Sequence, residues 1–345
     1  MIAARMYDAN CIKIEETAIP TIGNNEVLLK VRAAAVCGTD VRMFQNGYKG
    51  ITAQTPRILG HELSGTIEKV GNQVSGLKEG TRVAVAPNMG CGTCGACVSG
   101  NTHLCPEYRA LGINLDGGFA EYVLIPAKAI EQGNICQLGD SVTFEEAAIN
   151  EALSCVYNGF ERCDIHAGDT ALIIGAGPIG IMHAMLMKMG GCSKVFINDL
   201  SQERLNVCKR VDPSFITLNG SPTDVILQET KGCGVSAAVT ACPAPAAQSM
   251  ALELTAVNGR INFFGGIPAS KQPVAIDTNM IHYKQLIVSG TTRASVQQFR
   301  KTLSFIDSGI LDVKCLISKK YPLSDFHAAM SAAAAAEGLK HVITA

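Results

Sequence analysis

The sequence predicts an α/β protein with a β-rich first part and a doubly wound parallel sheet in its second part. Three observations predict this fold class. From residue 170 onward, apolar runs alternate with helical segments, which is typical of a parallel sheet covered by helices. Residues 1–150 instead contain short apolar runs separated by glycine and proline. The length of 345 residues also exceeds that of one ordinary domain.

Composition narrows the class of function. The chain is 47% hydrophobic and 17% charged, which suits a compact protein with a large core. Its net charge of −1 gives no electrostatic reason to expect binding to nucleic acid or to a membrane surface. The longest apolar runs are far shorter than the ~20 residues that span a bilayer, and residues 1–10 lack the apolar core of a secretory signal. We therefore expect a cytoplasmic protein.

Strands of a folded-over barrel or sandwich are expected in the first part at residues 27–36, 63–70, 82–86 and 119–125. Residues 141–166 have helical spacing of apolar positions and would bridge the two parts.

In the second part, strands are expected at 170–175, 194–198, 215–218, 235–240, 260–265 and 285–290. Helices are expected between most of them, at 178–190, 201–210, 222–231 and 245–257. Six strands match the two halves of a dinucleotide-binding fold. Residues 291–345 are expected to be helical, followed by a short closing strand within 338–343.

A glycine motif joins the first of these strands to the first helix. It reads Gly175-x-Gly177-x-x-Gly180, with Pro178 and Ile179 in its last interval. The first glycine permits a sharp turn, the second lets a pyrophosphate approach the backbone, and the third lets the helix lie close to the strand. The helix N-terminus then offers free N–H groups to phosphates. The motif predicts a dinucleotide site; the alternative is a glycine turn without a ligand.

Asp199 follows the next predicted strand, nineteen residues after Gly180. An acid at this distance is placed to bind both hydroxyls of an adenosine ribose, and its charge would repel a 2′-phosphate. We therefore expect NAD rather than NADP. Arg204 lies five residues further on, where it would reach the adenosine or simply lie on the helix surface.

Four of the fourteen cysteines crowd into one short segment: Cys91, Cys94, Cys97 and Cys105. Steps of three residues between cysteines, with a fourth cysteine nearby, allow a closed tetrahedral thiolate cage, so a structural zinc site is predicted. An iron–sulfur cluster is the competing interpretation, because thiolates also hold such clusters.

A second group of possible ligands is more dispersed. Cys37 opens the sequence Cys-Gly-Thr-Asp, and His61 and Glu62 follow Gly60. One thiolate, one imidazole and one carboxylate could share an ion with a coordination position left open, as in a catalytic zinc site. Asp40 could hold the ring N–H of His61. Taken singly, these residues could equally be a buried small side chain and polar turn residues.

Together these motifs resemble the zinc-containing medium-chain dehydrogenase/reductase family. The resemblance rests on CGTD at 37–40, GHE at 60–62, the four-cysteine lobe and GAGPIG at 175–180. It implies a GroES-like catalytic domain of residues 1–150 and 290–345, and a Rossmann domain of residues 151–289 inserted into it. It also implies two zinc ions per chain, one catalytic and one structural, and NAD as the hydride acceptor.

The sequence looks most similar to the polyol (sorbitol-type) branch of this family. The branch carries Glu-Pro-Leu-Ser where simple alcohol dehydrogenases have a second cysteine ligand, and Glu151 stands there, with Ala152 as a departure. Cys155, one helical turn later, is an alternative ligand.

The resemblance also implies roles for particular residues. Cys37, His61 and Glu62 would bind catalytic zinc, with Glu151 an exchangeable or water-mediated partner. Thr39 would relay the substrate proton. Lys340 would lie near the cofactor pyrophosphate, and Phe44 in the substrate pocket.

The resemblance implies the transfer of a hydride from a secondary alcohol to NAD, which gives a ketone or ketose. The expected alcohol is a polyol. Threonine, a polyol phosphate and a simple alcohol are alternative substrates. Arg42 or Arg57 would meet a phosphate or, equally, lie on the surface. A non-catalytic zinc-bound NAD sensor is a further alternative. By analogy with the family we expect a homodimer or homotetramer, and the edge strand at 285–290 offers a pairing surface.

Overall fold

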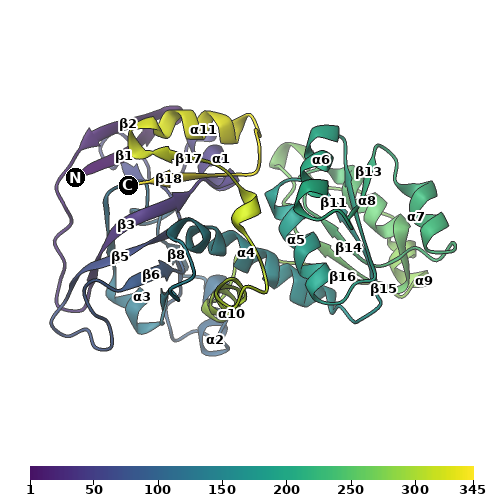
Figure 1. The fold of residues 1–345 in the computed structure, drawn as a ribbon, viewed down its shortest axis with the longest axis horizontal. Coiled ribbons are helices and arrows are strands. Elements are labelled where there is room, and N and C mark those ends of the chain that lie inside the picture. The colour runs from purple at the N-terminus through teal and green to yellow at the C-terminus, as the bar shows by residue number, and fades with distance from the viewer. The chain divides into compact units, whose positions relative to one another are not determined.

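The computed structural model describes residues 1–345 and divides the chain into two compact units. The first comprises Met1–Ser154 and Arg293–Ala345, and the second Cys155–Thr292. Both chain ends lie in the first unit (Figure 1). The unit boundary falls inside helix α4 (Phe144–Cys163), four residues beyond the expected one, so Glu151 belongs to the first unit. The start of α4 is fixed there, because the Ser64 hydroxyl donates to the Phe144 carbonyl and the Asn150 amide donates to the Phe299 carbonyl.

The first unit is built around a seven-stranded sheet. In spatial order its strands are β10 (Ile135–Gln137), β6 (Arg82–Val85), β5 (Glu62–Val70), β3 (Val27–Ala35), β18 (Lys340–Thr344) and β17 (Ile317–Pro322), with β9 (Tyr122–Ile125) also paired to β3. Ala35 lies opposite Glu62 on β5 and opposite Val342 on β18. This register brings three segments that are distant in sequence to one end of the sheet.

Smaller elements complete the first unit. A three-stranded sheet has the order β2 (Cys11–Glu16), β1 (Ile2–Asp8) and β4 (Arg57–Ile58), and β7 (Asn88–Met89) pairs with β8 (Arg109–Ala110). Its helices, besides the start of α4, are α1 (Gly38–Asn46), α2 (Gly95–Val98), α3 (Ala127–Glu131), α10 (Val296–Asp307) and α11 (Phe326–Ala334). The core includes an edge-to-face pair, Phe119 and Phe326, whose ring centroids lie 5.0 Å apart.

The strands predicted in the first part, the helix α4 and the closing strand β18 are present. The expectation that residues 291–345 are helical before the closing strand was wrong at β17, which was not predicted. Lys319 and Lys320 are exposed in this strand, because it forms an edge of its sheet, where charged side chains are common. Such an edge strand lacks the apolar run by which the other strands were recognised.

The second unit contains a six-stranded parallel sheet. Its order is β13 (Ile216–Asn219), β12 (Lys194–Asp199), β11 (Thr170–Ile174), β14 (Val235–Thr240), β15 (Thr255–Phe263) and β16 (Ile287–Gly290). Numbered within the unit this is the order 3-2-1-4-5-6 of a doubly wound fold, which confirms the predicted fold class. The helices are α5 (Pro178–Met189), α6 (Gln202–Val211), α7 (Thr223–Glu229), α8 (Pro245–Leu254) and α9 (Thr278–Tyr283).

The largest boundary difference from the prediction in the second unit is at the start of β15. The helix expected at 245–257 ends at Leu254, and β15 begins at Thr255 rather than at 260. Thr255 already pairs with Val235, after which the register shifts before regular pairing begins at Arg260. Asn258, in this shifted segment, has φ 61°. The irregularity breaks the alternation by which a strand is recognised in sequence.

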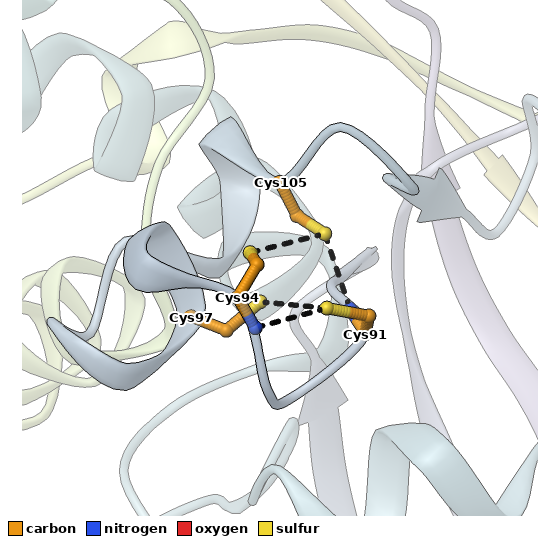
Figure 2. Close-up of side chains that lie close together, drawn as sticks. All are labelled: Cys91, Cys94, Cys97 and Cys105. Atoms are coloured by element: carbon orange, nitrogen blue, oxygen red, sulfur yellow. Dashed lines mark hydrogen bonds between the residues drawn. The ribbon is translucent and has the colours of Figure 1, made fainter.

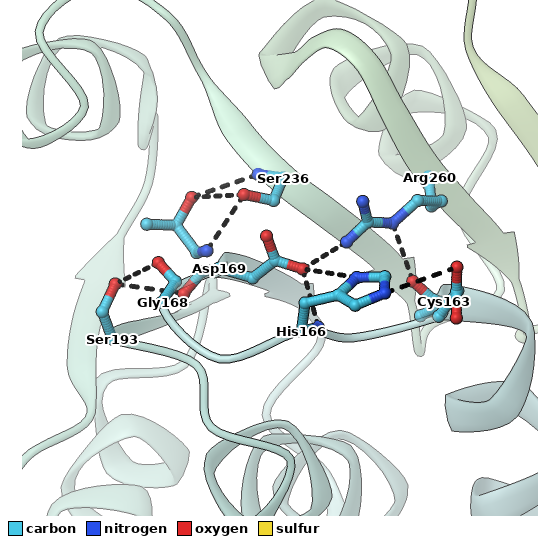
Figure 3. A network of polar contacts seen from close by, with 9 residues as sticks. Cys163, His166, Gly168, Asp169, Ser193, Ser236 and Arg260 are labelled. Atoms are coloured by element: carbon cyan, nitrogen blue, oxygen red, sulfur yellow. Dashed lines mark hydrogen bonds and ion pairs between the residues drawn. The ribbon is translucent and has the colours of Figure 1, made fainter.

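A polar network joins the end of α4 to strand β15 and to the loop before β11 (Figure 3). The Asp169 carboxylate accepts from the His166 backbone N–H at 3.0 Å and from the Arg260 guanidinium, which also donates to the Cys163 carbonyl at 2.8 Å. Burial acts against ionisation of Asp169, but these two donors outweigh it and lower the pKa of its carboxyl group. The network fixes the end of α4 against the sheet.

No helix in the chain combines the length and the apolar character needed to cross a lipid bilayer.

His183, on α5, is a buried titratable group with no polar partner. Neither ring nitrogen makes a hydrogen bond within the protein, and the ring packs edge-to-face on Phe264 with centroids 4.8 Å apart. Burial lowers the pKa of His183 to about 3. The imidazole is therefore neutral in the folded protein at every pH at which the protein would work.

This burial predicts a pH-dependent loss of stability. Because the unfolded state binds a proton near pH 6.5 and the folded state only near pH 3, stability falls as pH falls through that window. Between pH 7 and pH 5 the free energy of unfolding should drop by about 2 kcal/mol more in the wild type than in His183→Leu. Denaturant titrations followed by circular dichroism at pH 5, 6 and 7 measure this difference. Equal pH slopes in the two proteins would contradict the assignment.

Candidate metal and cofactor sites

The four predicted cysteines form one cluster on a lobe of the first unit, and their side chains converge (Figure 2). All four sulfur atoms lie within 4.8 Å of one another, with Cys91 and Cys97 4.0 Å apart and Cys94 and Cys105 3.7 Å apart. Zinc–sulfur bonds of ~2.3 Å imply tetrahedral edges of about 3.8 Å. The spacing therefore fits a single four-coordinate ion, whereas a multi-iron cluster would distribute its thiolates over separate iron atoms.

Backbone groups of the lobe stabilise negative charge on its sulfurs. The N–H groups of Cys94 and Cys91 donate to Cys91 Sγ and Cys105 Sγ at 3.3 and 3.2 Å. Hydrogen bonds from Thr93 and Cys94 lower the pKa of Cys91 to about 6. Burial, reinforced by the neighbouring thiols, raises the pKa of Cys97 to about 12. Full ionisation of all four groups thus calls for a cation among them.

The second predicted set also converges, within the first unit. Ligand atoms of Cys37, His61 and Glu62 all lie within 4.8 Å of one another. Cys37 is the N-cap residue of α1, His61 follows the Gly60 turn, and Glu62 begins β5. Gly60 has φ 93°, a conformation that favours glycine. The set joins a sulfur, a nitrogen and an oxygen donor, a mixture that zinc accepts.

The fully buried Asp40 carboxylate connects the two segments that carry these ligands. It accepts from the Cys37 backbone N–H at 2.9 Å and from the Gly60 backbone N–H at 3.4 Å. His61 Nδ1 lies 3.4 Å from the same carboxylate. Burial opposes protonation of His61, but Asp40 and then Cys37 outweigh it and raise its pKa. His61 Nδ1 faces Asp40 but makes no hydrogen bond within the protein, so the supporting role of Asp40 stays a prediction.

Lys340 contacts Glu62 of this set, a position that the sequence did not predict. Its ammonium is buried and donates to Glu62 Oε1 at 2.6 Å and to the Val36 carbonyl at 3.0 Å. Burial acts against its charge, but Glu62, Cys37 and Glu151 outweigh it and raise the pKa of Lys340. The expectation that Lys340 lies at the cofactor pyrophosphate remains a prediction, whereas its contact with Glu62 had no local sequence signal.

The buried charges of this site leave room for a cation. Burial raises the pKa of Glu62 to about 7, with Lys340 opposing and Glu151 reinforcing the shift. Glu62 Oε2 accepts no hydrogen bond, although the Lys340 ammonium lies 2.6 Å from it. Two carboxylates, those of Glu62 and Glu151, act on the single buried ammonium of Lys340. The Cys37 sulfur, the His61 ring and the Glu62 carboxylate are donors that a divalent ion accepts, so the donor set fits zinc.

Four other residues predicted at this site are not among the three convergent ligands. Glu151 is buried and acts electrostatically on Glu62 and Lys340, but it is not one of the three convergent ligands. Cys155, the alternative ligand, falls in the second unit. The Thr39 hydroxyl accepts from Arg42 at 2.9 Å, a contact that the sequence did not predict. Phe44 is partly buried against the core of the first unit.

The glycine turn of the second unit fits a dinucleotide. Gly175 has φ 114°. A Cβ atom on Gly180 would lie 1.8 Å from the Gly175 carbonyl oxygen, so the helix must approach the strand closely there. A Cβ atom on Gly177, the N-cap of α5, would meet nothing within 4 Å. That open space lies beside free N–H groups at the helix N-terminus, where Pro178 and Ile179 form the first turn.

Asp199 lies next to this turn, at the end of β12. Its Oδ2 accepts from the Ala176 backbone N–H at 2.7 Å, and its Oδ1 accepts from the Ser201 backbone N–H at 2.8 Å. Arg204 Nη1 lies 4.0 Å from Asp199 Oδ2 and is partly exposed. Asp199 is therefore held at the glycine turn by backbone donors.

Two glycine substitutions should separate binding from folding. Gly177→Ala places its methyl group in open space, so the free energy of unfolding should change by less than about 0.5 kcal/mol. The dinucleotide Kd should nevertheless rise at least ~10-fold, because the methyl group would occupy the phosphate approach. Gly180→Ala should cost about 1–3 kcal/mol of stability or more, because its methyl group collides with backbone. Calorimetric titration and denaturation measure both; unchanged binding by Gly177→Ala would contradict the site.

Comparison with known proteins agrees with this architecture. Residues 23–135 match the alcohol dehydrogenase GroES-like domain, and residues 178–308 match the zinc-binding dehydrogenase family. The chain is 33% identical over 319 residues to L-threonine 3-dehydrogenase of Bacillus velezensis, covering 91% of this chain and 89% of that protein. It is also 33% identical over 339 residues to sorbitol dehydrogenase of Bacillus subtilis, covering 96% and 93%.

Solved structures are similar over the whole chain. A zinc-binding dehydrogenase from Sinorhizobium meliloti 1021, bound to NADP, matches with TM-score 0.90 and 26% identity, covering 100% of this chain and 99% of that one. An alcohol dehydrogenase from Escherichia coli CFT073, complexed with NADH, matches with TM-score 0.90, 27% identity and the same coverage. The chain therefore belongs to the zinc-containing medium-chain dehydrogenase/reductase family, with a GroES-like unit and a Rossmann-type parallel sheet.

Proposed function

We propose that the protein is an NAD-dependent zinc dehydrogenase that oxidises a secondary alcohol of the polyol class to a ketone or ketose. The observation that supports this best is the buried convergence of Cys37, His61 and Glu62, held by Asp40. Three donors, rather than four, leave a coordination position for a substrate oxygen. Family membership makes the protein an oxidoreductase, and this site supports alcohol oxidation within the family.

Two zinc ions per chain are proposed, one in each ligand set. Cys91, Cys94, Cys97 and Cys105 would close a structural site with no open position. Zinc held by Cys37, His61 and Glu62 would supply Lewis acidity that lowers the pKa of a bound hydroxyl group. Glu151, buried nearby, would serve as an exchangeable or water-mediated partner.

The residues around this set would hold charge and move the proton. Asp40 orients the His61 ring through Nδ1 and leaves Nε2 for the metal. Lys340 neutralises part of the charge on Glu62. The Thr39 hydroxyl would take the substrate proton, and Arg42, which donates to its oxygen at 2.9 Å, would orient it.

NAD is the proposed acceptor, and its nicotinamide supplies the hydride-accepting carbon. Asp199 supports NAD over NADP, because its carboxylate would meet the ribose hydroxyls and repel a 2′-phosphate. Gly175, Gly177 and Gly180 would admit the pyrophosphate, with Pro178 and Ile179 at the helix start, and Arg204 would lie beside the adenosine. Similar structures hold NADH in one case and NADP in another. The preference for NAD over NADP is therefore proposed from Asp199 alone.

A homo-oligomer is also proposed. Strand β16 is an edge of its sheet and exposes Ile287. Its unpaired backbone groups could pair with a second copy, giving a homodimer or a homotetramer.

The activity is tested by following NADH formation on a panel of secondary alcohols, with NADP as the alternative cofactor. We expect turnover with NAD, higher kcat/KM for NAD than for NADP, and a loss of at least ~100-fold in kcat for Cys37→Ser, because a metal ligand is changed. The exposed Cys233→Ser is the matched control and should retain turnover. Full turnover by Cys37→Ser would refute the zinc role, and a preference for NADP would refute the role of Asp199.

A further inference from the structure

A cavity of about 420 Å³ lies in the first unit. Its walls include residues 48–51, which precede β4, Arg57 on β4, and residues 107–109, 113 and 114. Arg57 is four residues before His61 in the chain. Gly112, next to the lining residue Ile113, packs directly on the turn that carries His61, because a Cβ atom on Gly112 would lie 2.5 Å from the Gly60 backbone.

The lining of the cavity carries an excess of positive charge. Lys49, Arg57 and Arg109 contribute to its walls, against one carboxylate, that of Glu107. Neutral hydrogen-bonding side chains, Tyr48, Tyr108 and Asn114, and the apolar side chains of Ile51 and Ile113 also line it. The neutral groups suit hydroxyl groups, and the excess of cations favours an anionic group on the same molecule.

Arg57 is the best-placed cation. Its side chain is 25% exposed, and its backbone is fixed because Arg57 pairs with Met6 of β1. Its ion pair with Asp116 is a loose one, because Nη1 lies 3.6 Å from Asp116 Oδ1. That carboxylate oxygen already accepts from the Ile58 backbone N–H at 3.0 Å. Arg57 Nε is buried and has no hydrogen-bond partner, so the guanidinium retains donors for another group.

We propose that this cavity binds an anionic group, a phosphate or a carboxylate, carried by the alcohol substrate. The proposal rests on the alcohol oxidation proposed above and adds that the alcohol carries a phosphate or a carboxylate. The planar guanidinium of Arg57 would hold two anion oxygens at once, and Lys49 and Arg109 would add charge at the exposed rim. The substrate hydroxyl would then extend toward the His61 turn.

The test compares matched pairs of substrates that differ only in the anion. The pairs are sorbitol with sorbitol 6-phosphate, and 2-butanol with 3-hydroxybutyrate; the first tests a phosphate and the second a carboxylate. The wild type should show at least ~10-fold higher kcat/KM for the anionic member of one pair, and Arg57→Met should reduce that ratio at least ~10-fold. Arg32→Met, on an exposed position of β3 outside the cavity, is the matched control and should leave the ratio unchanged.

The outcomes separate this inference from the proposed function. Alcohol oxidation with no preference for an anion, or with a ratio that Arg57→Met does not change, overturns the inference and leaves the function standing. If no alcohol is oxidised, the function fails, and the cavity is judged by calorimetric titration with inorganic phosphate in the presence of saturating NAD. A Kd that rises at least ~10-fold in Arg57→Met, but not in Arg32→Met, supports the anion site; equal values in all three proteins overturn it.

Discussion

The Asp40 carboxylate is the constraint on which the rest of the first unit's site depends. It lies at the start of α1, yet it binds the backbone of both Cys37 and Gly60 and faces the ring of His61. A fully buried carboxylate is costly unless donors surround it. Those donors belong to the segments that carry the proposed metal ligands. The requirement to satisfy Asp40 therefore also sets the separation of Cys37 from His61.

The site also depends on the other end of the chain, because Lys340 neutralises part of the charge on Glu62. Glu62 begins β5, and Lys340 begins β18, and both strands flank β3. The sheet register brings the two side chains together as a buried ion pair at 2.6 Å. Such a pair is favourable only with good geometry and further hydrogen bonds, and Lys340 obtains one from the Val36 carbonyl. The return of residues 293–345 to the first unit is thus part of the site.

Features with local causes could be predicted from the sequence. The glycine turn, the four-cysteine lobe and most strands follow from spacing within a few residues. The contact of Lys340 with Glu62 depends on the order of strands in a sheet, which no local pattern records. Strand β17 was missed because its exposed lysines break the apolar pattern, and the start of β15 because of an irregular register. The cavity beside Arg57 likewise depends on tertiary packing, although Arg57 itself could be singled out from its position before the His61 turn.

The most direct test of the central claim is zinc content per chain in Asp40→Ala, measured after dialysis against a graded series of chelator concentrations and combined with X-ray absorption at the zinc edge. We expect the wild type to retain two ions, one of them bound by sulfur, nitrogen and oxygen. In Asp40→Ala that ion should be lost at ~10–100-fold lower chelator concentration, leaving one ion in an all-sulfur environment. Retention of both ions with unchanged affinity and unchanged spectra would contradict the proposed role of Asp40.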